Sequence, residues 1–331
     1  MNGNKQALSL QSDFKINYTA REITAFIGRG SATTEKIITT LNEIKETAGI
    51  KSLKSLEQAH ISQIIDKLQT ADMSLSAKNS YISSLNNVVK YLNRSDLNPI
   101  KAAEFGLSRD ISSSDGVNKE NSRESAESFK SWLQEKAEQT GDIRYTALRH
   151  AVDIQYSAGL RLRESLLVKL TTKDLSANTL NLAKKNDGAK NSRQRVINLN
   201  GEQKAIILEA RQFLKDNHLV NLNIGTQKQG RDFVNNTVKA FEKETGASFH
   251  YHGERHFYAH SFYKTAWQDK GYSNIECRAV TGESKQDWQG RVMADTGLSK
   301  AEFKSIDKEI RQDLSRLLGH ERVSITSRYL G

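Results

Sequence analysis

A polar segment in the first half of the chain most constrains how its 331 residues can fold. The stretch Gly106–Ser122, GLSRDISSSDGVNKENS, is rich in serine and nearly free of apolar periodicity. Such a segment cannot supply a core, and the chain is too long for one typical core. We therefore predict a linker at 106–122 between a helical domain, 1–105, and a second domain, 123–331. A long loop within one domain is the alternative.

Apolar residues recur at helical spacing before this linker. They predict helices at Thr34–Thr47, Ser55–Leu68 and Ser76–Leu92, with an earlier helix around Ala20–Ile27. The sole proline, Pro99, marks the exit from the last of them. The first domain is therefore expected to be a small helical bundle.

The second domain shows a mixed pattern. Helices are predicted at Ala126–Glu138, Arg144–Ser157, from about Arg163, and at Glu202–Asp216, Arg231–Glu244, Gly253–Lys270 and Ile306–Leu318. Short strands are predicted at Leu170–Leu175, Thr179–Ala183 and Arg195–Leu199. The fold class is therefore mainly α with a small antiparallel β-sheet.

The chain is basic, with 49 Lys and Arg against 39 Asp and Glu. Residues 1–104 carry 13 basic and 10 acidic side chains, so the excess is spread over both domains. This favours a polyanion embraced by two domains. No apolar stretch approaches the roughly 20 residues of a membrane helix, so we expect a cytoplasmic protein without a membrane partner. Cys277, the only cysteine, excludes an intrachain disulfide, and we expect it to be buried rather than a catalytic thiol.

Two segments of the second domain place cations where a phosphate could bind. In G-L-R, Arg161 lies between a glycine turn and a new helix, with Glu164 three residues on. Lys190 lies in GAKNSRQ, the charged turn between the second and third predicted strands. Each of these residues alone would be interpreted as an ordinary solvated polar group.

Two later segments add histidines, an arginine and a tyrosine. In HGERH, the spacing places His252 and Arg255 on one helix face, followed by His256. In L-G-H, His320 is followed nine residues later by Tyr329. The four segments gain their meaning from occurring together in this order.

In this order the segments resemble the tyrosine recombinases, also called phage-type integrases. That family has G-L-R with a following glutamate, a hairpin lysine, H-x-x-R-H on a helix, L-G-H, and a tyrosine nine residues later. The resemblance covers about Arg144–Gly331, and the ending LGHERVSITSRYLG is similar to integrases of mobile genomic islands. The first domain resembles the family's SAM-like core-binding domain in length and helicity only.

The resemblance implies a site-specific recombinase that integrates or excises a mobile element. Tyr329 would attack a DNA phosphate to give a 3′-phosphotyrosyl bond and a free 5′-hydroxyl. Arg161 and Arg255 would hold the non-bridging oxygens, because guanidiniums bind them in pairs and stay charged. The covalent bond conserves the energy of the broken one, so neither a metal nor another cofactor is expected.

The remaining residues would move protons and support the cluster. His252 would assist proton movement at the tyrosine, whose unperturbed pKa is about 10. His320 would donate a hydrogen bond to the phosphate, and Lys190 would protonate the departing 5′ oxygen. Glu164 and His256 would support these groups.

The catalytic lysine has three candidates. Aligning RVINL with the family's strand selects Lys190, whereas counting forward from Arg161 favours Lys185 or Lys184. We prefer Lys190, because turn length varies more easily than strand register. Tyr251, Tyr258 and Tyr263 are alternative nucleophiles, but none has the L-G-H spacing.

The sequence departs from the family pattern in two places. Glu254 stands where the family usually has leucine, and an extra segment, Gly271–Lys304, separates His252 from His320. The apolar side chains of this segment, Trp288, Val292 and Met293, could contact a neighbouring protomer. A solvent-exposed loop without a partner is the alternative.

The expected partners are double-stranded DNA attachment sites, with a free monomer forming a homo-tetramer on paired sites. The resemblance also allows accessory DNA-bending proteins and an association with the bacterial nucleoid. A type IB-like topoisomerase is the alternative enzyme on this fold. A non-catalytic DNA-binding regulator is the alternative outside enzymes.

Overall fold

The computed structural model describes residues 15–28, 31–107, 118–182, 194–320 and 322–331. The chain divides into two compact units, residues 1–111 (unit 1) and 112–331 (unit 2). The segment predicted as a linker, 106–122, includes residues that pack at both of its ends. Leu107 is buried in unit 1, and Asn121 is buried in unit 2. The middle part, 108–117, lies outside the described residues.

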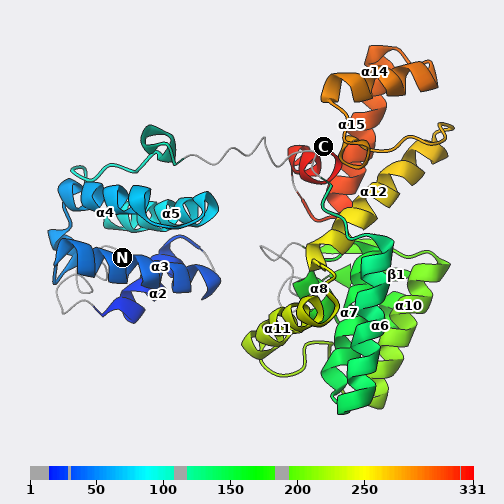
Figure 1. Ribbon diagram of the computed structural model, residues 1–331, viewed down its shortest axis with the longest axis horizontal. Helices are drawn as coiled ribbons and strands as arrows, with labels where there is room; N and C mark the ends of the chain where they lie inside the picture. The colour runs from blue at the N-terminus through cyan, green and yellow to red at the C-terminus, as the bar shows by residue number, and fades with distance from the viewer. Residues whose placement is uncertain (1–14, 29–30, 108–117, 183–193, 321) are drawn as a thin grey trace. The chain divides into compact units, whose positions relative to one another are not determined.

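Unit 1 is a helical bundle, as predicted (Figure 1). Its elements are α2 (Ile16–Phe26), α3 (Ser31–Ala48), η1 (Leu53–Ser55), α4 (Gln58–Thr70), α5 (Leu75–Leu92) and η2 (Ala102–Phe105). The apolar stripes of these helices meet in one core that includes Ile23, Leu41, Ile64 and Leu85. Ser74 caps the start of α5, and Asn93 ends it in the left-handed conformation.

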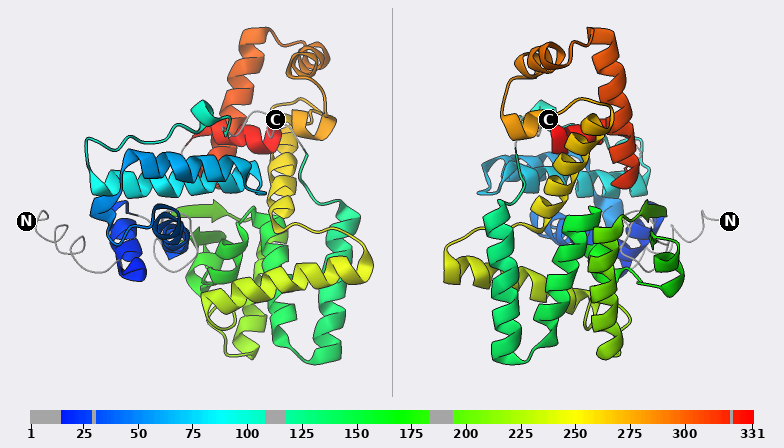
Figure 2. Two further views of the ribbon diagram at one scale, coloured as in Figure 1. Left: turned by 60° about the vertical axis from the view of Figure 1, so that its left-hand side comes forward. Right: turned by 90° about the vertical axis from the view of Figure 1, so that its right-hand side faces the viewer.

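Unit 2 begins with a mainly helical layer around an aromatic core. Its elements up to residue 245 are α6 (Arg123–Thr140), α7 (Ile143–Ala158), α8 (Leu162–Leu167), α9 (Thr172–Ser176), β1 (Thr179–Leu182), β2 (Arg195–Asn198), α10 (Gly201–Asp216) and α11 (Gln227–Thr245). Helices α6, α7 and α10 run side by side (Figures 1 and 2). Phe129 is fully buried, stacks on Phe249 and meets Phe241 edge to face.

The sheet is a two-stranded antiparallel hairpin in the described residues. Strand β1 pairs with β2 so that Leu180 faces Ile197, and both side chains are buried. The strand predicted at Leu170–Leu175 is wrong, because Thr172–Ser176 forms helix α9. A short apolar run carries no period that separates a strand from a helical turn, and packing decides between them.

The last part of unit 2 has its own core. Its elements are α12 (Tyr251–Asp269), α13 (Arg278–Thr281), α14 (Lys285–Thr296), α15 (Lys300–Leu317), η5 (Val323–Thr326) and α16 (Ser327–Leu330). The core joins Trp267 of α12 to Phe303 of α15 and to Tyr329. Cys277 is buried in it, as predicted.

The extra segment Gly271–Lys304 folds onto this core. Its helix α14 lies against α15 (Figures 1 and 2). Trp288 and Val292 are 2% and 0% exposed, so the prediction that they contact a neighbouring protomer is wrong. Met293 is partly buried against the same core. These side chains pack within their own chain because their spacing of four places them on one face of α14.

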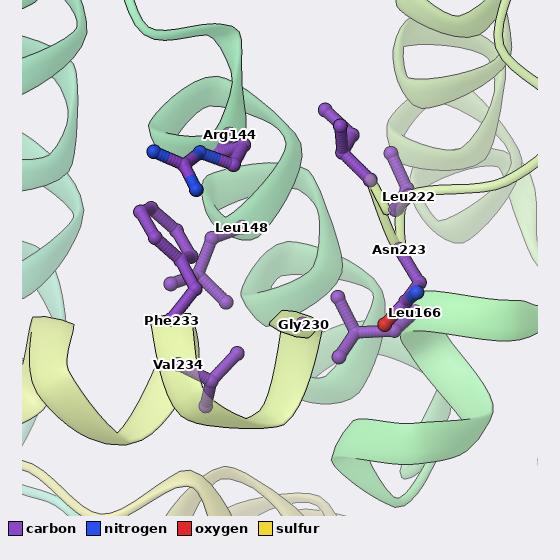
Figure 3. A pocket seen from close by; sticks show the side chains of 9 residues that line it. Arg144, Leu148, Leu166, Leu222, Asn223, Gly230, Phe233 and Val234 are labelled. Atoms are coloured by element: carbon purple, nitrogen blue, oxygen red, sulfur yellow. The ribbon is translucent and has the colours of Figure 1, made fainter. Parts of the chain in front are cut away.

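Two further observations bear on function. No helix within the described ranges is long and apolar enough to cross a membrane. A pocket between α7 and α11, lined by Arg144, Leu148 and Phe233 among others, has a cavity volume of about 10 Å³ (Figure 3). That is room for a single water molecule, so this pocket is not a substrate site.

Candidate active site

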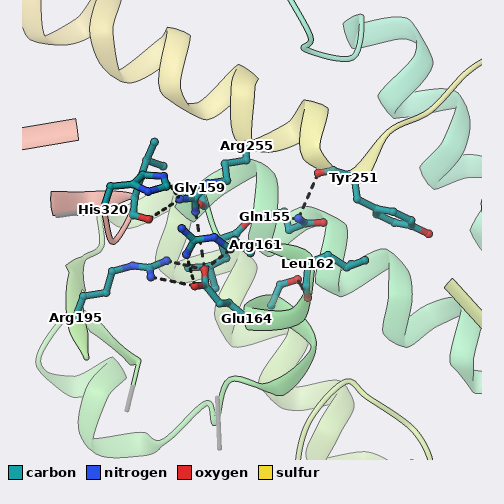
Figure 4. Close-up of polar contacts among 12 residues, drawn as sticks. Gln155, Gly159, Arg161, Leu162, Glu164, Arg195, Tyr251, Arg255 and His320 are labelled. Carbon is teal, nitrogen blue, oxygen red and sulfur yellow. Dashed lines mark hydrogen bonds and ion pairs between the residues drawn. The ribbon is translucent and has the colours of Figure 1, made fainter. Parts of the chain in front are cut away.

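The fully buried Glu164 is the centre of a cluster of arginines (Figure 4). Helix α7 ends at Gly159 in the left-handed conformation, and Arg161 then begins α8. Glu164, one turn into α8, accepts hydrogen bonds from the Arg161 backbone N at 2.8 Å and from its Nη1 at 2.7 Å. The carboxylate therefore fixes the arginine of the G-L-R turn.

Arg195 belongs to this cluster, although the sequence analysis interpreted it only as the start of a strand. Its Nη1 and Nη2 donate to the two carboxylate oxygens of Glu164 at 3.1 and 2.7 Å. Burial alone would raise the pKa of Glu164, but the bonds and charge of Arg195 and the charge of Arg161 lower it to about 2. The feature of the sequence that could have pointed to this role is a basic residue at the first position of strand β2, RVIN.

Gly319 lets Arg195 reach this position. A Cβ added at Gly319 would lie 2.5 Å from Nη1 of Arg195, and the backbone φ of Gly319 is +63°. Any other residue would be strained and would push against the guanidinium. The glycine of L-G-H thus has a steric role in the arginine cluster.

Arg255 connects three of the predicted segments. Its side chain on α12 is fully buried, and its Nη1 donates to the Gly159 carbonyl at 2.5 Å. Nη2 donates to the carbonyl of Leu318 and lies 3.3 Å from Nε2 of His320. Nη1 also lies 3.9 Å from Glu164. A glycine is needed at position 159, because a Cβ there would lie 2.3 Å from the Tyr258 ring on the same helix as Arg255.

Tyr329 on α16 presents its hydroxyl to this cluster. The oxygen accepts a hydrogen bond from Nε of Arg255 at 3.0 Å and lies 3.4 Å from Nε2 of His320. The tyrosine is 4% exposed. A guanidinium only donates, so Nε2 of His320 accepts from Arg255 in the tautomer in which that nitrogen carries no proton. The Tyr329 hydroxyl can then donate its proton to the same nitrogen.

His252 and His256 complete the surroundings of the tyrosine ring. Their ring centroids lie 5.7 and 4.7 Å from that of Tyr329. Burial, followed by the charges of Arg255, Arg161 and Lys119, lowers the pKa of His252 to about 4. Burial and its histidine neighbours lower the pKa of His256 to about 3. Both rings are therefore neutral at pH 7, and His252 can accept a proton.

The structure thus brings together Arg161, Glu164, His252, Arg255, His256, His320 and Tyr329. The three candidate lysines, Lys190, Lys185 and Lys184, lie outside the described residues. No group of three or more potential metal ligands occurs in the part of the chain that is described.

The alternative tyrosines point elsewhere. The hydroxyl of Tyr251 donates to the Val234 carbonyl at 3.4 Å, and that of Tyr263 donates to Asp307 at 2.6 Å. The Tyr258 ring packs against the glycine of G-L-R. Of the four tyrosines weighed, Tyr329 is the one whose hydroxyl is bonded to Arg255.

No family model and no curated protein matches the sequence. Solved structures do match along nearly its whole length. A Tn1549 transposon integrase in complex with transposon right end DNA is 15% identical, with a TM-score of 0.54 over 96% of this chain and 94% of that chain. The XerH site-specific recombinase bound to difH substrate is 14% identical, with a TM-score of 0.53 over 95% and 81%. A lambda integrase from a tetramer bound to a Holliday junction is 12% identical, with a TM-score of 0.56 over 100% and 81%. The chain therefore has the fold of the tyrosine recombinases.

Proposed function

We propose that this chain is a site-specific DNA recombinase that cleaves and rejoins double-stranded DNA through Tyr329. The observation that carries the proposal is the Tyr329 hydroxyl, 3.0 Å from Nε of Arg255 within the arginine cluster. Any buried tyrosine hydroxyl needs a hydrogen-bond partner, but here the partner is a cation, and a nucleophile that attacks a phosphate must lie beside the cations that bind it. The fold shared with DNA-bound recombinases supports the proposal.

The charge balance of the cluster favours an anionic substrate. Arg161, Arg195 and Arg255 surround the single carboxylate of Glu164, at 2.7, 2.7 and 3.9 Å. Two positive charges thus remain uncompensated by this carboxylate, and burial makes an unpaired charge costly. A phosphodiester would neutralise one of them, and the transition state would add more negative charge at the same place.

Two histidines lie near Tyr329 as acceptors for its proton. His320 is the closer by geometry, because its Nε2 lies 3.4 Å from the hydroxyl oxygen. His252, the residue that the family resemblance assigns to this step, has its ring centroid 5.7 Å from that of Tyr329 and a pKa lowered to about 4. After attack, the proton stays on Nε2 of His320, which can then donate a hydrogen bond to the phosphate. Lys190 remains our candidate for protonating the 5′ oxygen, with Lys185 and Lys184 as the alternatives.

The biological role follows from this chemistry as a proposal. Reversible cleavage without an energy source suits the integration or excision of a mobile element at two attachment sites. We propose that the free protein is a monomer and that four copies assemble on paired sites. The basic charge, +10 over the chain, would supply sequence-independent affinity for the DNA, with accessory DNA-bending proteins as further partners.

The test is covalent capture on nicked duplex DNA. Duplexes from candidate attachment sites carry a nick just 3′ of the cleavage site, so that the short 5′-hydroxyl fragment diffuses away and the adduct accumulates. The protein should yield an adduct stable in denaturing gels, and mass spectrometry of the digested adduct should place the nucleotide on Tyr329. Tyr329→Phe should bind the same DNA without forming an adduct.

Tyr263→Phe is the matched control. It removes a hydroxyl from another buried tyrosine of the same core, one bonded to Asp307 instead of Arg255. It should form the adduct normally. An adduct from Tyr329→Phe would show that another residue is the nucleophile. Relaxation of supercoiled plasmid by monomers, without paired sites, would instead favour a topoisomerase.

A further inference from the structure

A short segment just before α6 is fitted to the helix that carries Arg255. Asn121 donates from Nδ2 to the His250 carbonyl at 2.8 Å and to Glu254 Oε1 at 2.6 Å, and its Oδ1 accepts from the His250 N at 2.9 Å. A Cβ on Gly253 would lie 2.7 Å from the Asn121 side chain. Asn121 is thus a buried hydrogen-bond partner for Glu254, which stands where the family usually has leucine.

The neighbouring residue, Glu120, reaches the nucleophile through one histidine. Oε2 of Glu120 lies 2.6 Å from Nδ1 of His260, and Nε2 of His260 lies 2.7 Å from the backbone oxygen of Tyr329. His260 is 7% exposed. A carbonyl and an ionised carboxylate can only accept hydrogen bonds, so both ring nitrogens must donate. His260 is therefore held as an imidazolium between the two oxygens.

The other groups around His260 agree with this charge. Burial alone would lower the pKa of His260, but the nearby Cys277 side chain, the Glu120 carboxylate and the Tyr329 carbonyl raise it to about 10. The hydrogen bond with His260 lowers the pKa of Glu120. The His256 ring, 6.0 Å away, is neutral at pH 7 and so places no second positive charge beside His260.

We propose that Glu120 and His260 form a positioning pair that fixes the backbone of Tyr329 and so aims its hydroxyl at the phosphate. The inference rests on the function proposed above. Tyr329 lies on α16, a helix of four residues that is too short to hold its own geometry. His260 fixes the backbone side of this residue, and Arg255 fixes the hydroxyl side. Neither Glu120 nor His260 touches the hydroxyl, so neither is a catalytic residue.

The kinetic test separates positioning from binding. His260→Leu removes both donors at similar volume, and the first-order rate of adduct formation at saturating DNA should fall by roughly 10- to 100-fold. DNA affinity should stay within about twofold, because the arginine cluster is untouched. Glu120→Gln should slow the rate less, because the neutral ring keeps its bond from Nε2 to the Tyr329 carbonyl while its Nδ1 accepts from the amide nitrogen. The double variant should be no slower than His260→Leu, since the two residues act through one bond.

Glu309→Gln is the matched control for lost charge. It removes a carboxylate from another ion pair of α12, 2.9 Å from Lys270 at the end of that helix. Its rate should equal that of the parent. A parental rate in His260→Leu would overturn the proposal. So would a rate loss explained wholly by weaker DNA binding or by unfolding at the assay temperature.

Two further measurements do not depend on enzyme activity. They test the positioning role separately from the proposed recombinase function. Nitrogen NMR of the His260 ring should show both nitrogens protonated at pH 8 in the parent, and one in Glu120→Gln. Hydrogen exchange at residues 323–330 should accelerate in His260→Leu and not in Glu309→Gln. Unchanged exchange would overturn the positioning role even if the protein forms no adduct. If His260→Leu does not fold, His260→Gln takes its place: it keeps one donor, and its exchange at residues 323–330 should still be faster than the parent's. Exchange no faster than the parent's would overturn the proposal.

Discussion

The hydroxyl oxygen of Tyr329 lies 3.0 Å from Nε of Arg255, although 74 positions separate the two residues in the chain. Arg255 is held on its other side by the carbonyls of Gly159 and Leu318. One guanidinium thus ties the G-L-R turn, the HGER helix and the L-G-H turn to the tyrosine. Three of the four segments found in the sequence meet at this side chain, and the fourth, the turn with Lys190, lies outside the described residues.

Arg255→Lys should abolish most adduct formation while the charge is kept. A lysine cannot bond two carbonyls and a phenol at once in this geometry. We expect the adduct rate to fall at least about 100-fold and stability to fall by roughly 2–4 kcal/mol, because buried carbonyls lose their donors. Gel-based adduct kinetics and urea unfolding measure the two effects. An unchanged rate would mean that charge alone suffices.

Much of this arrangement could be predicted from the sequence, because its signals are local. The apolar spacing predicted a helix at Ser76–Leu92, and α5 spans Leu75–Leu92. The order of the motif residues predicted that Arg255, His320 and Tyr329 come together. Each motif has a defined place on the shared fold, so their order in the chain translates into proximity.

The rest depended on tertiary contacts that leave little local trace. The bond between Glu120 and His260 joins residues 140 positions apart. Arg195 had no motif of its own, and its role appears only where β2 passes Glu164. Trp288 and Val292 lie on a short helix with polar neighbours, so their spacing was too brief to distinguish a core face from a protein interface.

Arg195→Met should destabilise unit 2, and Glu164→Gln should partly restore it. The methionine leaves a fully buried carboxylate without its bidentate partner, which costs roughly 3–5 kcal/mol. The amide in the double variant carries no charge, so the double variant should be more stable than Arg195→Met alone. All three tryptophans lie in unit 2, so fluorescence-detected urea unfolding follows this unit. Additive losses would argue against direct coupling.

Glu164 should also contribute to stability in a pH-dependent way. Its pKa is lowered from 4.5 to about 2 in the folded chain, so the stabilisation is present above pH 4.5 and is lost as the pH falls toward 2. The contribution is on the order of 3 kcal/mol. Between pH 5 and pH 3, the free energy of unfolding should therefore fall more in the parent than in Glu164→Gln. Parallel pH profiles would show that the carboxylate is not ionised in the cluster.

Trp288→Ala should show that the extra segment is part of the fold. The Trp288 indole is 2% exposed, meets Phe303 edge to face at 5.5 Å and donates to the Glu276 carbonyl at 2.9 Å. Its loss should cost roughly 3–5 kcal/mol, because it leaves a cavity and an unpaired carbonyl. Gln286→Ala, an exposed change on the same helix, should alter stability by less than about 0.5 kcal/mol. Trp132 and Trp267 still report unfolding in the variant. If Trp288→Ala were as stable as the parent but failed to assemble on paired sites, the segment would be an interface after all, and its packing on α15 would be incidental.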